Sequence, residues 1–124
     1  MRALLALPLV IAGCVGGQGA PDAPRGPVVP ILFDGGGIEA VGTGQRIDFG
    51  RDQAGVIQTM TRLQGGAPTL LPCDVAALTA ARWPGGPLLV FRNGAFAGWS
   101  IPDAAQSANG QSRFGQTCAP LAIN

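Results

Sequence analysis

The cysteines carry the most evident chemistry in this 124-residue sequence, and there are three of them: Cys14, Cys73 and Cys118. A thiol can form a thioether with a lipid, a disulfide with a second thiol, or a bond to a metal ion. Histidine, tyrosine and lysine are absent. Histidine catalysis, histidine-ligated metal, lysine Schiff-base chemistry and lysine-dependent phosphate loops are therefore excluded. The cysteines are the first candidates for functional residues.

The segment that ends at Cys14 predicts a lipid anchor. The apolar run from Ala3 to Ala12 is too short to span a bilayer, but it has the length of the apolar region of a secretory signal. It ends in Ile11-Ala12-Gly13-Cys14, which resembles the lipobox of bacterial lipoproteins. The resemblance implies a signal peptide over 1–13, cleavage after Gly13, and acyl chains such as palmitate on Cys14. The alternative is an ordinary secretory signal in which Cys14 is incidental.

The residue after Cys14 indicates which membrane a lipoprotein would occupy. In lipoproteins of bacteria with two membranes, Asp at this position tends to mark retention in the inner membrane, and here the residue is Val15. The resemblance therefore implies the outer membrane, with the domain facing the periplasm. The first partner is then the membrane itself, through the lipid on Cys14.

Residues 14–30 are predicted to form a spacer that follows the lipidated cysteine. Its prolines recur at every third position, which is the period of polyproline II: Pro21, Pro24, Pro27 and Pro30. An extended spacer would reach roughly 50 Å. A docking strip for an aromatic groove is the alternative interpretation. Residues 31–124 are predicted to form one small periplasmic domain.

With Cys14 lipidated, Cys73 and Cys118 remain as a pair. An even pair in the oxidising periplasm predicts a disulfide. The alternative is two free thiols in a reactive or redox role, although no Cys-x-x-Cys motif and no histidine would activate them.

The remaining polar residues predict no enzyme, no cofactor and no metal site. Asp48 and Asp52 straddle a predicted strand-to-helix turn, so Asp52 is expected to cap the helix and Asp48 to be solvated. The three serines lack a histidine or lysine to activate them. Without Arg2, the eight basic residues become seven and equal the seven acidic ones, which argues against a nucleic-acid partner.

The first half of the domain is predicted to contain three short strands and one helix. Apolar stretches at 28–33 and 38–41, and a stretch at 45–49 that alternates with Ile47 and Phe49 on one face, are separated by glycine-rich turns. Asp52 is a suitable N-cap for a helix whose apolar residues lie on one face, and Gly65-Gly66 ends it.

The second half contains the clearest local signal. Residues 88–92 and 95–100 predict a hairpin with a type I′ turn at Asn93-Gly94. Residues 74–83 fit either a helix or a strand, and we favour a strand at 78–83. A loop follows at 102–111, and 112–117 is expected to be an edge strand that returns Cys118 to Cys73. The fold class is therefore α+β, with an antiparallel sheet of about four strands and one main helix packed across it.

The stretch 47–56, followed by a helix and Gly66-Ala67-Pro68, resembles small outer-membrane lipoproteins of the SmpA/OmlA type. That resemblance implies an accessory of an assembly machinery, with helices packed on a three-stranded antiparallel sheet. The sequence departs from this pattern in its cysteine pair and in having one clear helix rather than two.

We therefore expect a non-enzymatic accessory that interacts with, or helps to assemble, other envelope proteins. The alternative is an inhibitor or ligand-binding module tethered to the outer membrane, with a loop such as 102–111 inserted into its partner. Trp83, Trp99 and the five phenylalanines are expected mostly in the core. An exposed apolar patch around Trp99 would favour assembly, whereas a deep pocket with converging acids would favour an enzyme.

Overall fold

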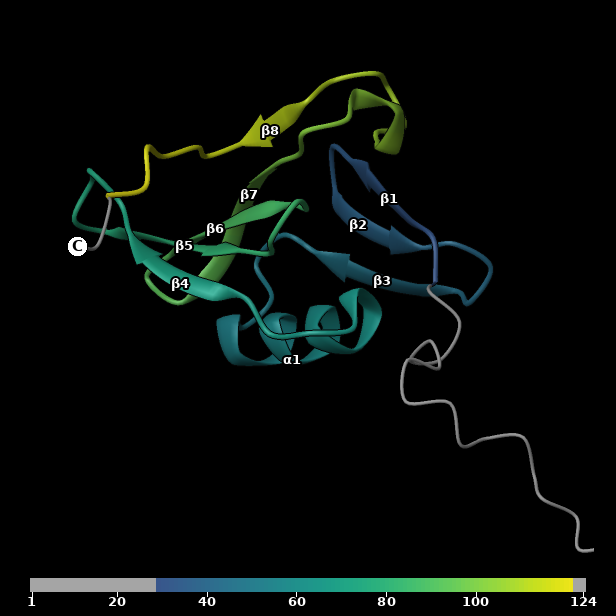
Figure 1. The fold of residues 1–124 in the computed structure, drawn as a ribbon, viewed down its shortest axis with the longest axis horizontal. Coiled ribbons are helices and arrows are strands. Elements are labelled where there is room, and N and C mark those ends of the chain that lie inside the picture. Colours follow the sequence, from purple (N-terminus) through teal and green to yellow (C-terminus); the bar gives the residue numbers. More distant parts are fainter. Residues whose placement is uncertain (1–28, 122–124) are drawn as a thin grey trace, which may run out of the picture.

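A computed structural model describes residues 29–121 as an α+β domain with two antiparallel sheets (Figure 1). The predicted signal peptide, Cys14 and almost all of the spacer lie outside the described residues, as do residues 122–124. No helix within 29–121 is long and apolar enough to cross a membrane.

The first sheet, sheet A, is a meander of three short strands, β1 (Ile31–Asp34), β2 (Gly37–Ala40) and β3 (Gln45–Asp48), in that order. All neighbouring strands are antiparallel. The three short strands predicted from the sequence are thus confirmed, with somewhat different ends.

Helix α1 (Gln53–Gln64) begins and ends at the predicted residues. The side chain of Asp52 accepts a hydrogen bond from the backbone N–H of Gly55, which satisfies one free donor of the first turn. Gly65 adopts the left-handed conformation at φ 78°, and its N–H donates to the Thr61 carbonyl.

The second sheet, sheet B, has five strands in sequential order: β4 (Thr69–Pro72), β5 (Leu78–Arg82), β6 (Leu88–Arg92), β7 (Ala95–Ser100) and β8 (Arg113–Gly115). The β6–β7 hairpin confirms the prediction, since Asn93 (φ 50°) and Gly94 (φ 81°) both have the positive φ of a type I′ turn. Residues 78–82 form a strand, as favoured, and not a helix.

The predicted single sheet of about four strands requires correction. The described residues contain eight strands in two sheets, and β4 was not predicted. The expected last strand at 112–117 is shorter, because only Arg113–Gly115 pair with β7. The 102–111 loop contains a short 3-10 helix at Ala104–Gln106.

Strand β4 is the outer strand of sheet B, and its free edge carries few donors. The Pro72 carbonyl accepts from the N–H of Leu121, so the backbone groups of Pro72 point away from β5. Backbone groups alternate along a strand, so those of Leu70 and of the flanking Pro68 point the same way. Two of these three positions are prolines and have no N–H to donate.

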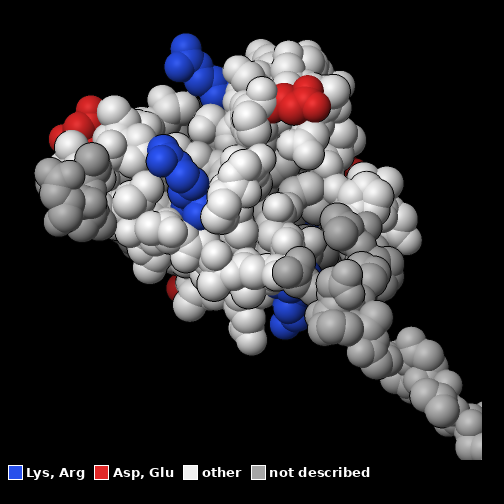
Figure 2. Space-filling model, in the orientation of Figure 1, with Lys and Arg blue, Asp and Glu red and all other residues white. Residues whose placement is uncertain are grey.

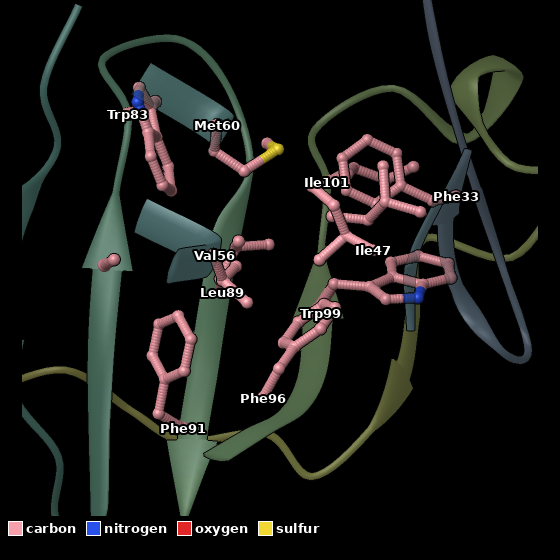
Figure 3. Packing of buried hydrophobic residues seen from close by; sticks show 12 residues of the cluster. Phe33, Ile47, Val56, Met60, Trp83, Leu89, Phe91, Phe96, Trp99 and Ile101 are labelled. Carbon is pink, nitrogen blue, oxygen red and sulfur yellow. The ribbon is translucent and has the colours of Figure 1, made fainter. Parts of the chain in front are cut away.

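The core lies on both faces of sheet B. On one face, Val56 and Met60 of α1 pack towards Leu89 of β6 (Figure 3). The opposite face has a smaller cluster built on Ala80 and Val90. Strands β5 and β6 therefore bury side chains in both directions, which explains their nearly continuous apolar sequence.

Three connections join the two sheets. The segment after β3 pairs with β7, since the N–H of Phe96 donates to Arg51 O at 2.8 Å. Trp99 of β7 is fully buried and donates from Nε1 to Asp34 O at 2.9 Å, while its ring packs on Phe33. In Figure 3 the indole points towards sheet A. Sheet A is thereby fixed against sheet B.

Candidate functional site

The disulfide joins two segments that are distant in the sequence. Cys73 directly follows β4 and is bonded to Cys118, which follows β8, with the Cα atoms 5.6 Å apart. Beside it, the Asp74 N–H donates to Ala119 O and the Leu121 N–H donates to Pro72 O. The predicted disulfide is confirmed, so these two thiols are not free. The segment 116–121 is thereby bonded at its start to β7, the neighbour of edge strand β8, and at its end to β4, the opposite edge strand of sheet B.

A groove of about 400 Å³ lies beside this disulfide. Asp74 and Val75, which follow β4, form part of its lining. Ser100 and Arg113, which are paired across β7 and β8, form another part. Residues 117–119 complete it. This groove combines a cation, an anion, hydroxyl groups and one exposed apolar side chain, and it is our candidate functional site.

Strand register shows on which face of sheet B the groove lies. Arg113 is opposite Ser100, and Ser100 is opposite Leu88, which packs against the cluster on the face away from α1. Directly opposed residues of antiparallel strands share a face. Arg113 and Ser100 therefore point away from the helix.

Two further arginines lie on the same face. Arg82 alternates with Leu78 and Ala80, and Arg92 is opposite Leu78. Leu78 and Ala80 both belong to the cluster on that face. We call this surface the arginine face, defined by Arg82, Arg92 and Arg113. The five strands of sheet B contain these three arginines and no acidic residue.

Sheet A has the opposite charge balance, because one arginine is surrounded by three acids. Arg46 donates to both carboxylate oxygens of Asp34, at 2.8 and 2.9 Å, and from Nε to Asp48 at 3.0 Å. Glu39 lies 3.7 Å from the same guanidinium. Figure 2 shows acidic and basic side chains standing apart on a largely uncharged surface. The balanced total charge therefore conceals an acidic sheet A and a basic sheet B.

The hydrogen bonds from Arg46 hold the pKa of Asp34 below its ordinary value, although partial burial opposes the shift. The N–H of Gly36 also donates to this carboxylate and lowers its pKa further. The same pairing raises the pKa of Arg46. This cluster stabilises the three-stranded meander, and its charged groups pair with one another.

The lowered pKa of Asp34 makes stability depend on acidity. The ionised Asp34 carboxylate makes its full contribution to the free energy of unfolding above about pH 4, the ordinary pKa of a carboxyl group. This contribution is lost as the pH falls through the lower pKa that Asp34 has in the folded protein. We expect Asp34→Asn to cost about 1 kcal/mol at pH 7 and progressively less below pH 4. Urea unfolding at pH 7 and pH 3 measures this, with Asp103→Asn as the control carboxylate. An equal cost at both pH values would contradict the assignment.

The carboxylates and serines considered for catalysis have other roles. Asp52 caps α1 and Asp48 binds Arg46, so they do not form a catalytic pair. Ser107 is buried and donates to Asn109. Only Ser100 lines the groove. Within residues 29–121, no group of three or more potential metal ligands occurs.

The 102–111 loop packs onto sheet A. The Ala108 N–H donates to Phe33 O, and Ser107 forms an isolated bridge with Phe33 of β1. The disulfide holds residue 118 and not this loop. The loop therefore lacks the protruding form expected of an inserted inhibitor loop. The Trp99 ring is fully buried and forms no exposed patch itself, whereas Phe114, which stacks on it, is 38% exposed.

Comparison with known protein families, with curated proteins and with solved structures finds no match for this chain. The lipobox and the SmpA/OmlA-type resemblance therefore stay predictions from sequence, and Cys14 lies outside the described residues. The arginine face was missed at the sequence level. The available signal was that the predicted strands of the second half contain arginines but no acid.

Proposed function

We propose that this protein is a lipid-tethered, periplasm-facing and non-enzymatic component of a bacterial envelope, which presents the groove to a partner protein. The observation that carries the proposal is the Cys73–Cys118 disulfide. Disulfides persist in oxidising compartments, so the bond supports export from the cytoplasm. Export agrees with the apolar segment before Cys14 and with the lipobox resemblance.

The arrangement of the domain supports the direction of presentation. The described chain enters β1 at one end of the long axis, whereas the end of β4 and the segment after β8 lie towards the other end (Figure 1). The groove is built from these latter segments. A tether attached before β1 would therefore leave the groove facing away from the membrane.

The inventory of charged side chains supports a binding role. The acids of sheet A are engaged by Arg46, and Asp52 caps a helix. By contrast, the groove combines Arg113 with two hydroxyl groups, and Val75 beside it is 47% exposed. A mixed polar and apolar surface of this kind is suited to a partner. The groove also favours the second candidate, a tethered ligand-binding module.

Site-specific photo-cross-linking in cells tests the presentation of the groove. A photoreactive side chain at Val75 is expected to capture one envelope protein reproducibly. Val41, which is 42% exposed beside sheet A, provides a matched control and is expected not to capture it. Equal capture from both positions, or capture only from Val41, would contradict the proposal. Mass spectrometry of the adduct identifies the partner.

A further inference from the structure

We propose that the groove recognises the free C-terminal carboxylate of an extended peptide segment of the partner. This inference rests on the proposed function, since it names the chemistry that the presented groove would bind. Arg113 would hold the carboxylate, the segment that carries Cys118 would pair with the peptide backbone, and Val75 would contact an apolar side chain.

The charge of the groove provides the first argument. Within residues 29–121, Arg113 forms no ion pair, in contrast to Arg46. It lies on the arginine face, on a sheet without acids. A guanidinium binds a carboxylate through two parallel hydrogen bonds, and the Ser100 and Thr117 hydroxyls in the same lining supply further donors. Asp74 in the same lining balances the charge of Arg113, and its Oδ1 accepts from the Ala119 N–H. The guanidinium with its neighbouring hydroxyl donors fits a carboxylate better than a neutral group.

The backbone of the C-terminal segment provides the second argument. The Gln116 N–H donates to Ala97 O, and the Ala119 N–H donates to Asp74 Oδ1. Between them, the backbone N–H groups of Thr117 and Cys118 donate to no other described residue. Both residues line the groove, between Arg113 and the disulfide in the sequence. Because successive N–H groups of an extended segment point to opposite edges, an extended peptide can bond one of these two donors by strand addition.

The size and shape of the groove provide the third argument. A volume of about 400 Å³ is at the lower end of the range for ligand sites and accommodates about two or three residues. Asp74, which also lines the groove, repels a second negative charge, so a ligand with a single carboxylate is favoured. A flat anionic bilayer would present many charges and could not enter the groove.

Binding of short peptides to the purified full chain in detergent tests the proposal. The probe is a fluorescein-labelled pool of tetrapeptides with randomised apolar residues and a free C-terminal acid, and the same pool as a C-terminal amide is the comparison. We expect the acid pool to bind at least 10-fold more tightly than the amide. Arg113→Gln should weaken binding of the acid by roughly 10–100-fold. Arg62→Gln, which removes the same charge from α1, should leave it unchanged.

Several outcomes would overturn the inference. The first is equal binding of the acid pool and the amide pool. The second is binding of the acid pool that survives Arg113→Gln. The third is an amide pool ending in Asp that binds as tightly as the acid pool. The inference would also be overturned if the protein bound vesicles containing phosphatidylglycerol through Arg113 and did not bind the acid pool. The arginine face would then bind a membrane.

Failure of this inference is distinguishable from failure of the proposed function. A Val75 cross-link that persists in Arg113→Gln cells overturns carboxylate recognition and leaves the presented groove in place. Carboxylate-dependent peptide binding without any Val75 cross-link in cells overturns the presentation to a partner protein and leaves the groove chemistry in place.

Discussion

Removing the disulfide through Cys73→Ala together with Cys118→Ala is expected to lower the free energy of unfolding by about 3–4 kcal/mol. The two cysteines are 45 positions apart, so the bond closes a long loop and restricts the unfolded chain. A domain of this size has a total stability of roughly 5–10 kcal/mol. The loss would therefore leave a marginally stable protein. Urea unfolding followed by far-ultraviolet circular dichroism measures it.

The wild-type protein provides its own control for this prediction. Its midpoint of unfolding should fall in reductant to that of the double alanine variant, whereas the variant should not respond to reductant. A variant within 1 kcal/mol of the oxidised wild type would show that other contacts already hold the C-terminal segment. The hydrogen bonds between residues 72–74 and 119–121 are the candidates.

Cys14→Ser is expected to abolish acylation completely and to leave the signal peptide attached. Serine has a hydroxyl in place of the thiol, so the thioether to the lipid cannot form. Without acyl chains the mature lipid anchor is lost. Metabolic labelling with a tagged palmitate, together with intact mass and membrane fractionation, measures both effects. Labelled lipid on the serine variant would contradict the anchor assignment.

Val15→Asp is the matched control for this anchor. The cysteine is retained, so acylation and cleavage should be unchanged. By the lipoprotein sorting pattern, the protein should move from the outer to the inner membrane in a bacterium with two membranes. Absence of label from both the wild type and Val15→Asp would indicate that the segment works as an ordinary secretory signal.

Local signals predicted the elements whose geometry depends on a few neighbouring residues. Asn93 and Gly94 specify a turn because both tolerate positive φ, and the flanking strands pair as expected. Asp52 and Gly65 delimit α1 because one satisfies free N–H groups and the other adopts a left-handed conformation.

The elements that were missed depend on contacts between distant residues. Strand β4 is short, largely exposed and ends in proline, so its sequence has little strand character. It forms because β5 pairs with it and the disulfide holds its end. The ambiguity at 74–83 has the same origin. Alanine-rich residues favour a helix locally, yet Ala80 and Ala81 fit a strand that packs on both faces.

The candidate site was predictable only in part. Cysteine counting identified the Cys73–Cys118 pair, because two cysteines in a protein predicted to be exported are expected to form a disulfide. The arginine face required the strand register, since Arg82, Arg92 and Arg113 come from three strands and share a face only through their pairing. Without knowledge of the strand pairing, the sequence shows only that eight arginines nearly balance seven acidic residues.

The prolines at the edge of β4 have a consequence for proteins crowded on a surface. An exposed strand edge with free donors can recruit the same edge of a neighbouring copy and begin an aggregate. Here Pro68 and Pro72 remove two donors, and the Pro72 carbonyl is already occupied by Leu121. Copies brought close together would therefore find no continuous template for strand addition at the edge of β4. This edge is blocked without charged residues in β4.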